Sequence, residues 1–203
     1  MPINEIQKLI KADCKNRSFI LGIDGLGGAG KTTYVQSVLD IFEKKGINAV
    51  VLHMDDFIQP EKIRYDSAKE EWYCYYYLQW RYDYFISEIL TPIHLGKEIQ
   101  KEIELYDKTT DTYKKHYIEI SRDTVVIIEG IFLQRPELSP YFDYVIFIDL
   151  PKEERLNRVI KRDTYIGGNQ AIQEKYEQRY FPAEEKYMTD CSPAKRANYI
   201  IRT

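Results

Sequence analysis

Short, almost continuously apolar runs alternate with amphipathic stretches along most of this chain. Each run has the length of a strand, and strands that are apolar throughout are typical of sheets covered by helices on both faces. The runs lie at 19–23, 47–53, 125–128, 144–149 and 199–201. Apolar residues at helical spacing fill most of the intervals between them, at 32–45, within 69–90 and at 151–162. This alternation predicts an α/β fold of three layers, with a mostly parallel sheet, right-handed crossovers and helices on both faces.

The region 95–120 follows a different pattern. Short alternating runs at 103–106 and 117–120 are separated by polar turns. They predict a small antiparallel flap beside the main sheet. The chain contains no internal repeat and no low-complexity linker, and its 203 residues suffice for one substantial core. We therefore expect a single domain over residues 1–203.

The first apolar run leads directly into a glycine-rich loop and then an amphipathic helix. Residues 25–32 read Gly-Leu-Gly-Gly-Ala-Gly-Lys-Thr and fit G-x-x-x-x-G-K-[ST], the pattern of a phosphate-binding loop or P-loop. In such a loop the backbone N–H groups turn toward phosphate oxygens, and the helix N-terminus adds partial positive charge. Lys31 can reach the β- and γ-phosphates, and the hydroxyl of Thr32 can bind Mg²⁺. The residues expected to bind the nucleotide are Gly25, Gly27, Gly28, Ala29, Gly30, Lys31, Thr32 and Thr33. An ordinary glycine turn is disfavoured by the strand before the loop and the helix after it.

Two further apolar runs end in acidic residues. The run 47–53 continues into Asp55 and Asp56, and the run 125–128 continues into Glu129. Because parallel strands end at one edge of a sheet, these carboxylates should lie near the glycine loop. Phosphoryl transfer uses one carboxylate near the acceptor hydroxyl, which Asp55 would supply, and one near the metal, which Glu129 would supply. One of Asp55 and Asp56 could instead cap a turn, and the sequence leaves open which of them is the base.

These motifs, in this order, resemble the uridine kinase and phosphoribulokinase family of P-loop kinases, which also contains pantothenate kinases. The resemblance is carried by the segments 22–33, 54–57, 105–107, 126–131, 142–149 and 154–163. It implies a P-loop NTPase fold and a phosphotransferase that uses ATP and Mg²⁺ to phosphorylate a hydroxyl of a small metabolite. It also implies that Asp55 is the catalytic base and that Glu129 serves the metal and substrate side of the site.

Arginines occur at helical spacing after the fourth apolar run. Arg158 and Arg162 stand four positions apart and can share one helix face, and Arg155 lies one turn earlier. Fixed positive charge that closes over the phosphates would stabilise the transferring group and exclude water. The resemblance implies that the region 155–180 is a helical lid, with Arg158 and Arg162 near the triphosphate as catalytic residues. A solvated helix face paired with acids of the same helix is the alternative.

The acceptor pocket is less clearly marked, although the chain is dense in aromatic residues before the flap. Trp72, Tyr76, Trp80 and Tyr84 recur at four-residue steps. This spacing predicts one face of an amphipathic helix, packed in the core or between subunits. An aromatic wall for a flat substrate is the alternative. Homo-oligomer formation stays open.

Other acceptor contacts are implied by the resemblance. Tyr106 and Asp107 match a Tyr-Asp pair that lies near the nucleoside in uridine kinases. The histidine that follows this pair in those enzymes is absent, because this chain has Thr110 and Asp111 there. Arg64 and Tyr65, which follow the Asp55 loop, could also touch the acceptor, and a surface role is the alternative for both. The full set of expected substrate contacts is Asp55, Arg64, Tyr65, Tyr106 and Glu129.

Composition narrows the range of partners. The net charge of -3 and the pI near 5.7 give no basic footprint, which argues against nucleic acid. The longest apolar stretches are too short to span a bilayer, and no apolar signal segment begins the chain, which argues against a membrane partner. Cys14, Cys74 and Cys191 lie far apart, as in a reduced protein without a disulfide frame or zinc site. We therefore expect a cytoplasmic protein that acts on a small-molecule acceptor.

Together the residues predict an ATP- and Mg²⁺-dependent small-molecule kinase, with a nucleoside of the uridine or cytidine type as the first choice of acceptor. Pantothenate, a sugar phosphate and nicotinamide riboside are alternative acceptors. A GTP-dependent switch is a rival, but the chain lacks an Asn-Lys-x-Asp motif, and its Glu129 strand lacks Asp-x-x-Gly. A nucleotide-binding module without catalysis is a second rival, and the presence of both Asp55 and Glu129 argues against it.

Overall fold

The computed structural model describes residues 2–13 and 16–202, and its centre is a parallel sheet. The five strands lie in the order β2-β5-β1-β6-β7, and every neighbouring pair is parallel. They are β1 (Phe19–Gly25), β2 (Ala49–His53), β5 (Val125–Gly130), β6 (Tyr144–Asp149) and β7 (Tyr199–Arg202). β1 and β5 are buried along their whole length, as their continuous apolar character predicts. The predicted parallel sheet is confirmed.

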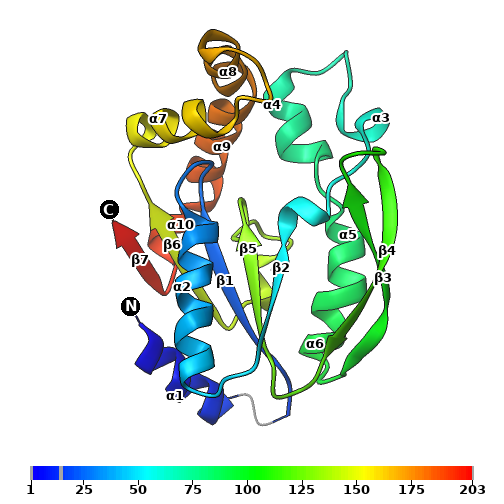
Figure 1. The fold of residues 1–203 in the computed structure, drawn as a ribbon, viewed down its shortest axis with the longest axis vertical. Helices are drawn as coiled ribbons and strands as arrows, with labels where there is room; N and C mark the ends of the chain where they lie inside the picture. The colour runs from blue at the N-terminus through cyan, green and yellow to red at the C-terminus, as the bar shows by residue number, and fades with distance from the viewer. Residues whose placement is uncertain (1, 14–15, 203) are drawn as a thin grey trace.

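Helices cover both faces of this sheet (Figure 1). The helix that follows the glycine loop, α2 (Lys31–Lys44), lies across one face and packs Val35, Val38 and Phe42 against the strands. α1 (Ile3–Asp13) contributes the buried Ile6 to the same layer. The opposite face is covered by a second core that includes Ile89 and residues of α9 (Phe181–Cys191). The three layers expected from the sequence are therefore present.

The region 95–120 forms an antiparallel hairpin outside the main sheet. Its strands are β3 (Ile99–Asp107) and β4 (Thr112–Ile120), and they pair along their whole length. Ile99, Ile103 and Ile120 anchor the hairpin because their side chains are buried in the core on the α9 side of the sheet. Figure 1 shows the hairpin standing beside the helices α5 and α6, which precede it in the chain. The predicted flap is confirmed.

The long helix expected within 69–90 breaks in its middle, which corrects the prediction. The segments before the break are α4 (Glu71–Tyr73) and the π-helical η2 (Cys74–Leu78); those after it are α5 (Tyr82–Phe85), the π-helical η3 (Ile86–Leu90) and α6 (Thr91–His94). The chain leaves the helix because its backbone bonds to another segment. The N–H of Arg81 donates to the carbonyl of Phe57, and the N–H of Gln59 donates to the carbonyl of Gln79, both at 2.8 Å.

The aromatic residues of this region fill the core, as their spacing predicts. Tyr76 and Trp80 are 3% and 6% exposed, and Trp72 and Tyr84 pack against the same core from its edge. Phe132 provides the partner surface, because the rings of Tyr76 and Trp80 both meet it edge to face.

The remaining helices cluster at the carboxyl ends of the strands and behind the sheet (Figure 1). They are η1 (Met54–Asp56), α3 (Glu61–Arg64), η4 (Ser139–Tyr141), α7 (Lys152–Arg162), α8 (Asn169–Lys175), η5 (Tyr176–Tyr180) and α10 (Pro193–Arg196). Pro151 is the N-cap residue of α7, so that helix begins at Lys152, one residue later than expected. Within the part of the chain that the structure describes, every helix is too short or too polar to cross a bilayer. Cys74 and Cys191 are buried free thiols, and Cys14 lies outside the described residues.

Candidate active site

The strand order brings the glycine loop and both acidic strand ends to one edge. β5 lies between β1 and β2, and Glu129 is in register with Ile23 on one side and with His53 on the other. The loop that follows β1 and the turn that follows β2 therefore flank Glu129. The convergence expected from the sequence is present, because neighbouring parallel strands end together.

The glycine loop ends where α2 begins. Gly30 is the N-cap residue of α2, in the left-handed region at φ 96°, and has no side chain with which to cap the first N–H groups. The first N–H groups of a helix can bind an anion, which the helix dipole also favours. Lys31 curls back over the loop, and its ammonium donates to the carbonyls of Gly25 and Leu26 at 2.9 and 3.2 Å. Its charge thus lies directly at the loop.

Glu129 is the centre of a small polar network. Its Oε2 accepts a hydrogen bond from the hydroxyl of Thr32 at 3.3 Å and lies 2.7 Å from Nδ1 of His53. The bond to Glu129 raises the pKa of His53. Burial would raise the pKa of Glu129, but the bond from His53 and the charge of Lys31 outweigh it and lower that pKa. Glu129 is therefore held as a carboxylate beside the loop.

This donor set fits magnesium when a nucleotide supplies further oxygens. The Thr32 hydroxyl and the Glu129 carboxylate are hard oxygen ligands, which Mg²⁺ prefers. No group of three or more His, Cys, Asp and Glu side chains that could hold a metal occurs among residues 2–13 and 16–202. One or two protein oxygens together with phosphate oxygens are typical of magnesium bound mainly through substrate phosphates.

Asp55 and Asp56 share the short helix η1 but differ in their surroundings. Asp55 is exposed, whereas Asp56 is half-buried, and burial raises the pKa of Asp56. The charge of Lys108, at the hairpin tip, also acts on Asp56. Asp55 is therefore the more accessible of the two carboxylates.

The arginines of α7 differ in what they contact. Nη1 of Arg158 approaches the carbonyl of Ala29 in the glycine loop at 3.4 Å. Arg162 bonds to Asp163 at 2.6 Å, which raises the pKa of Arg162, and its side chain is 62% exposed. Arg155 is only 4% exposed, so the solvated-face alternative is wrong for this residue. α7 therefore contacts the glycine loop directly through Arg158.

The expected acceptor residues Arg64, Tyr65 and Tyr106 lie together between α3 and the hairpin tip. The guanidinium of Arg64 lies over the rings of Tyr106 and Tyr65, with centroid distances of 5.0 and 5.6 Å. The hydroxyl of Tyr106 donates to Asp111 at 2.8 Å, and Arg64 lies 3.7 Å from the same carboxylate. Asp111 is thus part of this cluster.

Arg179 is a member of this region that sequence reasoning missed. It is 2% exposed, its guanidinium lies 4.4 Å from the ring centroid of Tyr65, and it donates to Glu71 at 2.7 Å. Its position in a polar stretch of the sequence gave no signal, because its burial depends on contacts from residues more than 100 positions away.

Asp24 was also missed, although the sequence carried a signal. It interrupts the apolar run directly before the loop, is fully buried, and accepts bonds from the Tyr187 hydroxyl at 2.5 Å and the Gln134 amide at 3.0 Å. An acidic side chain at the end of a buried strand indicates that other residues provide it with hydrogen-bond partners, since an unpaired buried charge is costly.

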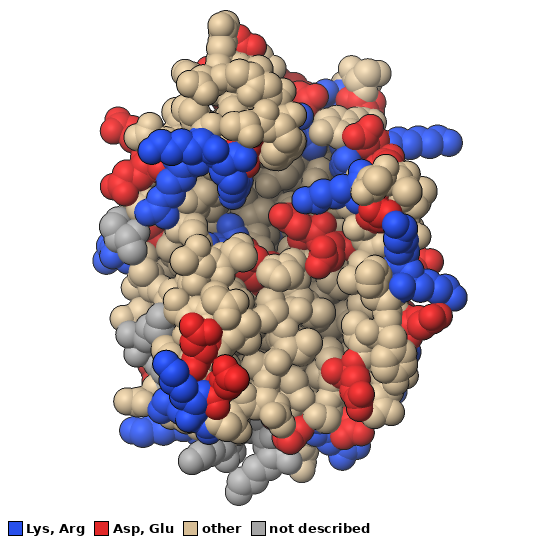
Figure 2. Space-filling model, in the orientation of Figure 1, with Lys and Arg blue, Asp and Glu red and all other residues tan. Residues whose placement is uncertain are grey.

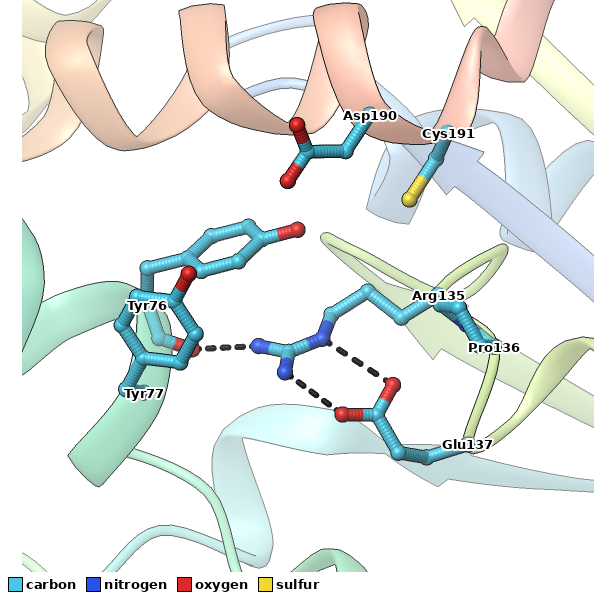
Figure 3. A pocket seen from close by; sticks show the side chains of 7 residues that line it. All are labelled: Tyr76, Tyr77, Arg135, Pro136, Glu137, Asp190 and Cys191. Carbon is cyan, nitrogen blue, oxygen red and sulfur yellow. Dashed lines mark hydrogen bonds and ion pairs between the residues drawn. The ribbon is translucent and has the colours of Figure 1, made fainter.

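The surface around these residues is hollowed. Figure 2 shows the hollow in the upper half of the face in view, with basic side chains over α7 on one rim and acidic side chains on the other. A separate cavity of about 230 Å³ lies elsewhere and is lined by Tyr76, Tyr77, Arg135, Pro136, Glu137, Asp190 and Cys191. Figure 3 shows the guanidinium of Arg135, which donates hydrogen bonds to Glu137 and to the backbone carbonyl of Tyr76. None of these lining residues belongs to the glycine loop.

The fold and the converging loop define a P-loop kinase of small molecules. A family model described as the phosphoribulokinase / uridine kinase family matches residues 20–203, and the chain belongs to this family. A structure described as a possible uridine kinase from Bacillus stearothermophilus is 33% identical, with a TM-score of 0.77 over 98% of this chain and 96% of that one. A uridine kinase of Alkaliphilus metalliredigens is 28% identical over 92% of this chain and 88% of its own length. Phosphoribulokinase from Rhodobacter spheroides, at 13% identity, shares the fold with a TM-score of 0.64 over 93% of this chain and 71% of that one.

Proposed function

We propose that this kinase transfers the γ-phosphate of ATP to a hydroxyl of a nucleoside, with magnesium. The observation that carries the proposal is the meeting of Thr32 and Glu129 beside the glycine loop. Lys31 and the loop N–H groups bind the phosphates, and Thr32 and Glu129 hold the metal. When bound, Mg²⁺ neutralises phosphate charge.

Asp55 acts as the base in this proposal. It takes the proton of the acceptor hydroxyl, whose oxygen bonds to the γ-phosphorus while the bond from that phosphorus to the β,γ-bridging oxygen breaks. The products are ADP and a phosphate monoester. Arg158 and Arg162 cover the transferring group from the segment 155–180, which we propose as the lid. The cytoplasmic location and the single domain over 1–203 remain predictions.

The choice of a nucleoside acceptor has two supports. Two relatives that match more than nine-tenths of this chain are described as a uridine kinase, at 28% identity, and a possible uridine kinase, at 33% identity. In addition, the buried cations near the expected acceptor region are already paired, Arg64 with Asp111 and Arg179 with Glu71. A cation whose charge is already compensated by a nearby carboxylate attracts a phosphate or carboxylate less strongly than a free cation does. This favours an uncharged nucleoside over a sugar phosphate or pantothenate.

The test is ADP release by the purified protein with ATP, Mg²⁺ and one acceptor at a time. The panel contains uridine, cytidine, nicotinamide riboside, pantothenate and a pentose phosphate, and parallel assays use GTP. We expect the highest kcat/KM with uridine or cytidine. A higher kcat/KM with an anionic acceptor would refute the nucleoside choice. Silence across the panel with ATP binding intact would instead support the non-catalytic alternative.

A further inference from the structure

The peptide units of Gly27, in the glycine loop, are held by two buried charged side chains. The N–H of Gly27 donates to Oε1 of Glu184 at 2.8 Å, and its carbonyl accepts from Nη1 of Arg155 at 3.0 Å. The same Nη1 donates to Oε2 of Glu184 at 2.8 Å, and Nε of Arg155 bonds to the carbonyl of Leu150 at 3.1 Å. We call Arg155 and Glu184 the loop clamp. It ties the loop to α7 and α9 at once.

The two middle glycines of the loop fit this packing. A Cβ added to Gly27 would lie 3.1 Å from Oε1 of Glu184. A Cβ added to Gly28 would lie 2.8 Å from the Val159 side chain and 2.9 Å from the carbonyl of Arg155, and Gly28 has a φ of 78°. Any side chain at Gly28 would therefore push α7 away. These glycines allow helices, and not only phosphates, to approach the loop closely.

Burying the two charges of the loop clamp costs desolvation free energy, so the pair adds little to the stability of the fold. Arg155 and Glu184 are 4% and 2% exposed, so both charges lose their hydration. Burial raises the pKa of Glu184, against the lowering effect of Arg155, which is the sign of that cost. A buried ion pair is often no more stabilising than apolar residues of the same volume. Its hydrogen bonds to the loop point to a positioning role.

We propose that Arg155 and Glu184 are positioning residues that fix the glycine loop in its phosphate-binding shape before ATP arrives. The inference rests on the proposed function in that the loop binds a triphosphate. The N–H of Gly27 donates to Glu184. Gly27 therefore serves nucleotide binding through the shape of the loop, and its N–H does not contact a phosphate. Loss of the clamp should weaken ATP binding, because the loop must then order itself on binding. The acceptor, bound at the Asp55 side, should be unaffected.

Two variants and a neighbouring control test the proposal. Glu184→Gln keeps an oxygen for the N–H of Gly27 but removes the charge that pairs with Arg155. Arg155→Lys keeps the positive charge but lacks the planar fork that reaches Leu150, Gly27 and Glu184 together. Glu185→Gln is the control, since Glu185 lies on the same helix, is 72% exposed and pairs only with Lys152 among the described ion pairs.

For each variant we would measure the Kd of a fluorescent ATP analogue, the KM values for ATP and acceptor, and thermal unfolding. We expect Arg155→Lys to raise the Kd and the KM for ATP about tenfold or more, with the acceptor KM unchanged. Glu184→Gln should raise them by a smaller factor, because the glutamine oxygen can still accept from the N–H of Gly27 and Arg155 still reaches its carbonyl. An ATP Kd within twofold of the wild type for both folded variants would overturn the clamp, as would an equal rise in the acceptor KM. Failure of the wild type to bind the analogue would instead refute the proposed function.

Discussion

The hydroxyl of Thr32 lies 3.3 Å from Oε2 of Glu129, although 97 positions separate them in the chain. Adjacent parallel strands explain the meeting, because Thr32 follows the loop after β1 and Glu129 lies near the end of β5. Two oxygens so placed beside a phosphate-binding loop can share one magnesium ion with the nucleotide.

Glu129→Gln should therefore change the magnesium requirement of the reaction. The amide retains an oxygen but lacks the charge that holds a divalent cation. At saturating nucleotide, we expect kcat/KM for the acceptor to fall about a hundredfold. The Mg²⁺ concentration that gives the half-maximal rate should also rise. Titration of the rate with Mg²⁺ measures both effects. Glu119→Gln, on the exposed side of β4, is the matched control. An unaltered Mg²⁺ titration in Glu129→Gln would show that Glu129 does not serve the metal.

Lys31→Ala should abolish detectable turnover. The ammonium lies at the mouth of the loop, against the carbonyls of Gly25 and Leu26, where it can move to a phosphate. Loss of a charge-assisted contact to the transferring group should reduce kcat about a hundredfold or more. Lys44→Ala, at the far end of the same helix, controls for the loss of a lysine from α2. Retained turnover in Lys31→Ala, measured by ADP release, would remove Lys31 from the chemistry.

Asp55→Asn and Asp56→Asn decide between the two acids of η1. Asp55 is exposed, whereas Asp56 is half-buried, and the charge of Lys108 in the hairpin acts on Asp56. We expect Asp55→Asn to lower kcat about a hundredfold to ten-thousandfold, the range typical of a lost general base. ATP affinity should stay near that of the wild type. A larger loss of kcat in Asp56→Asn than in Asp55→Asn would transfer the role of base to Asp56.

The strands, the flap and the glycine loop could be predicted because each depends on local sequence. Apolar runs of strand length and the G-x-x-x-x-G-K-T spacing need no distant partner to be recognised. The break after Leu78 could not be predicted, since its cause is bonding of Gln79 and Arg81 to Gln59 and Phe57. The spacing of the aromatic residues remained correct as a description of core positions and wrong as a description of one continuous helix.

The loop clamp was beyond the sequence for a related reason. Arg155 and Glu184 each stand in a strongly charged stretch, where solvent exposure is the ordinary expectation. They are 29 positions apart, and only the packing of α7 and α9 on the glycine loop brings them together. Asp24 is the opposite case, because a lone acid at the end of an apolar run is visible in the sequence.

Asp24 leads to a prediction about stability and pH. Burial raises the pKa of Asp24 above its ordinary 3.8, and the bonds from Tyr187 and Gln134 offset only part of this. Between 3.8 and the raised pKa, the folded chain binds more protons at this site than the unfolded chain does. The contribution of Asp24 to the free energy of unfolding must therefore fall as pH rises through that interval.

Asp24→Asn removes this titration, so the two chains should diverge as pH rises. We expect the free energy of unfolding of Asp24→Asn, minus that of the wild type, to increase with pH from about 4 upward until Asp24 is fully ionised. Urea unfolding at a series of pH values gives this difference, in which the other titrating groups cancel. Asp40→Asn, at an exposed position of α2, should give a difference that does not rise in this way. A difference for Asp24→Asn that is constant or decreases with pH would mean that the protein accommodates the buried charge without penalty, through Tyr187 and Gln134.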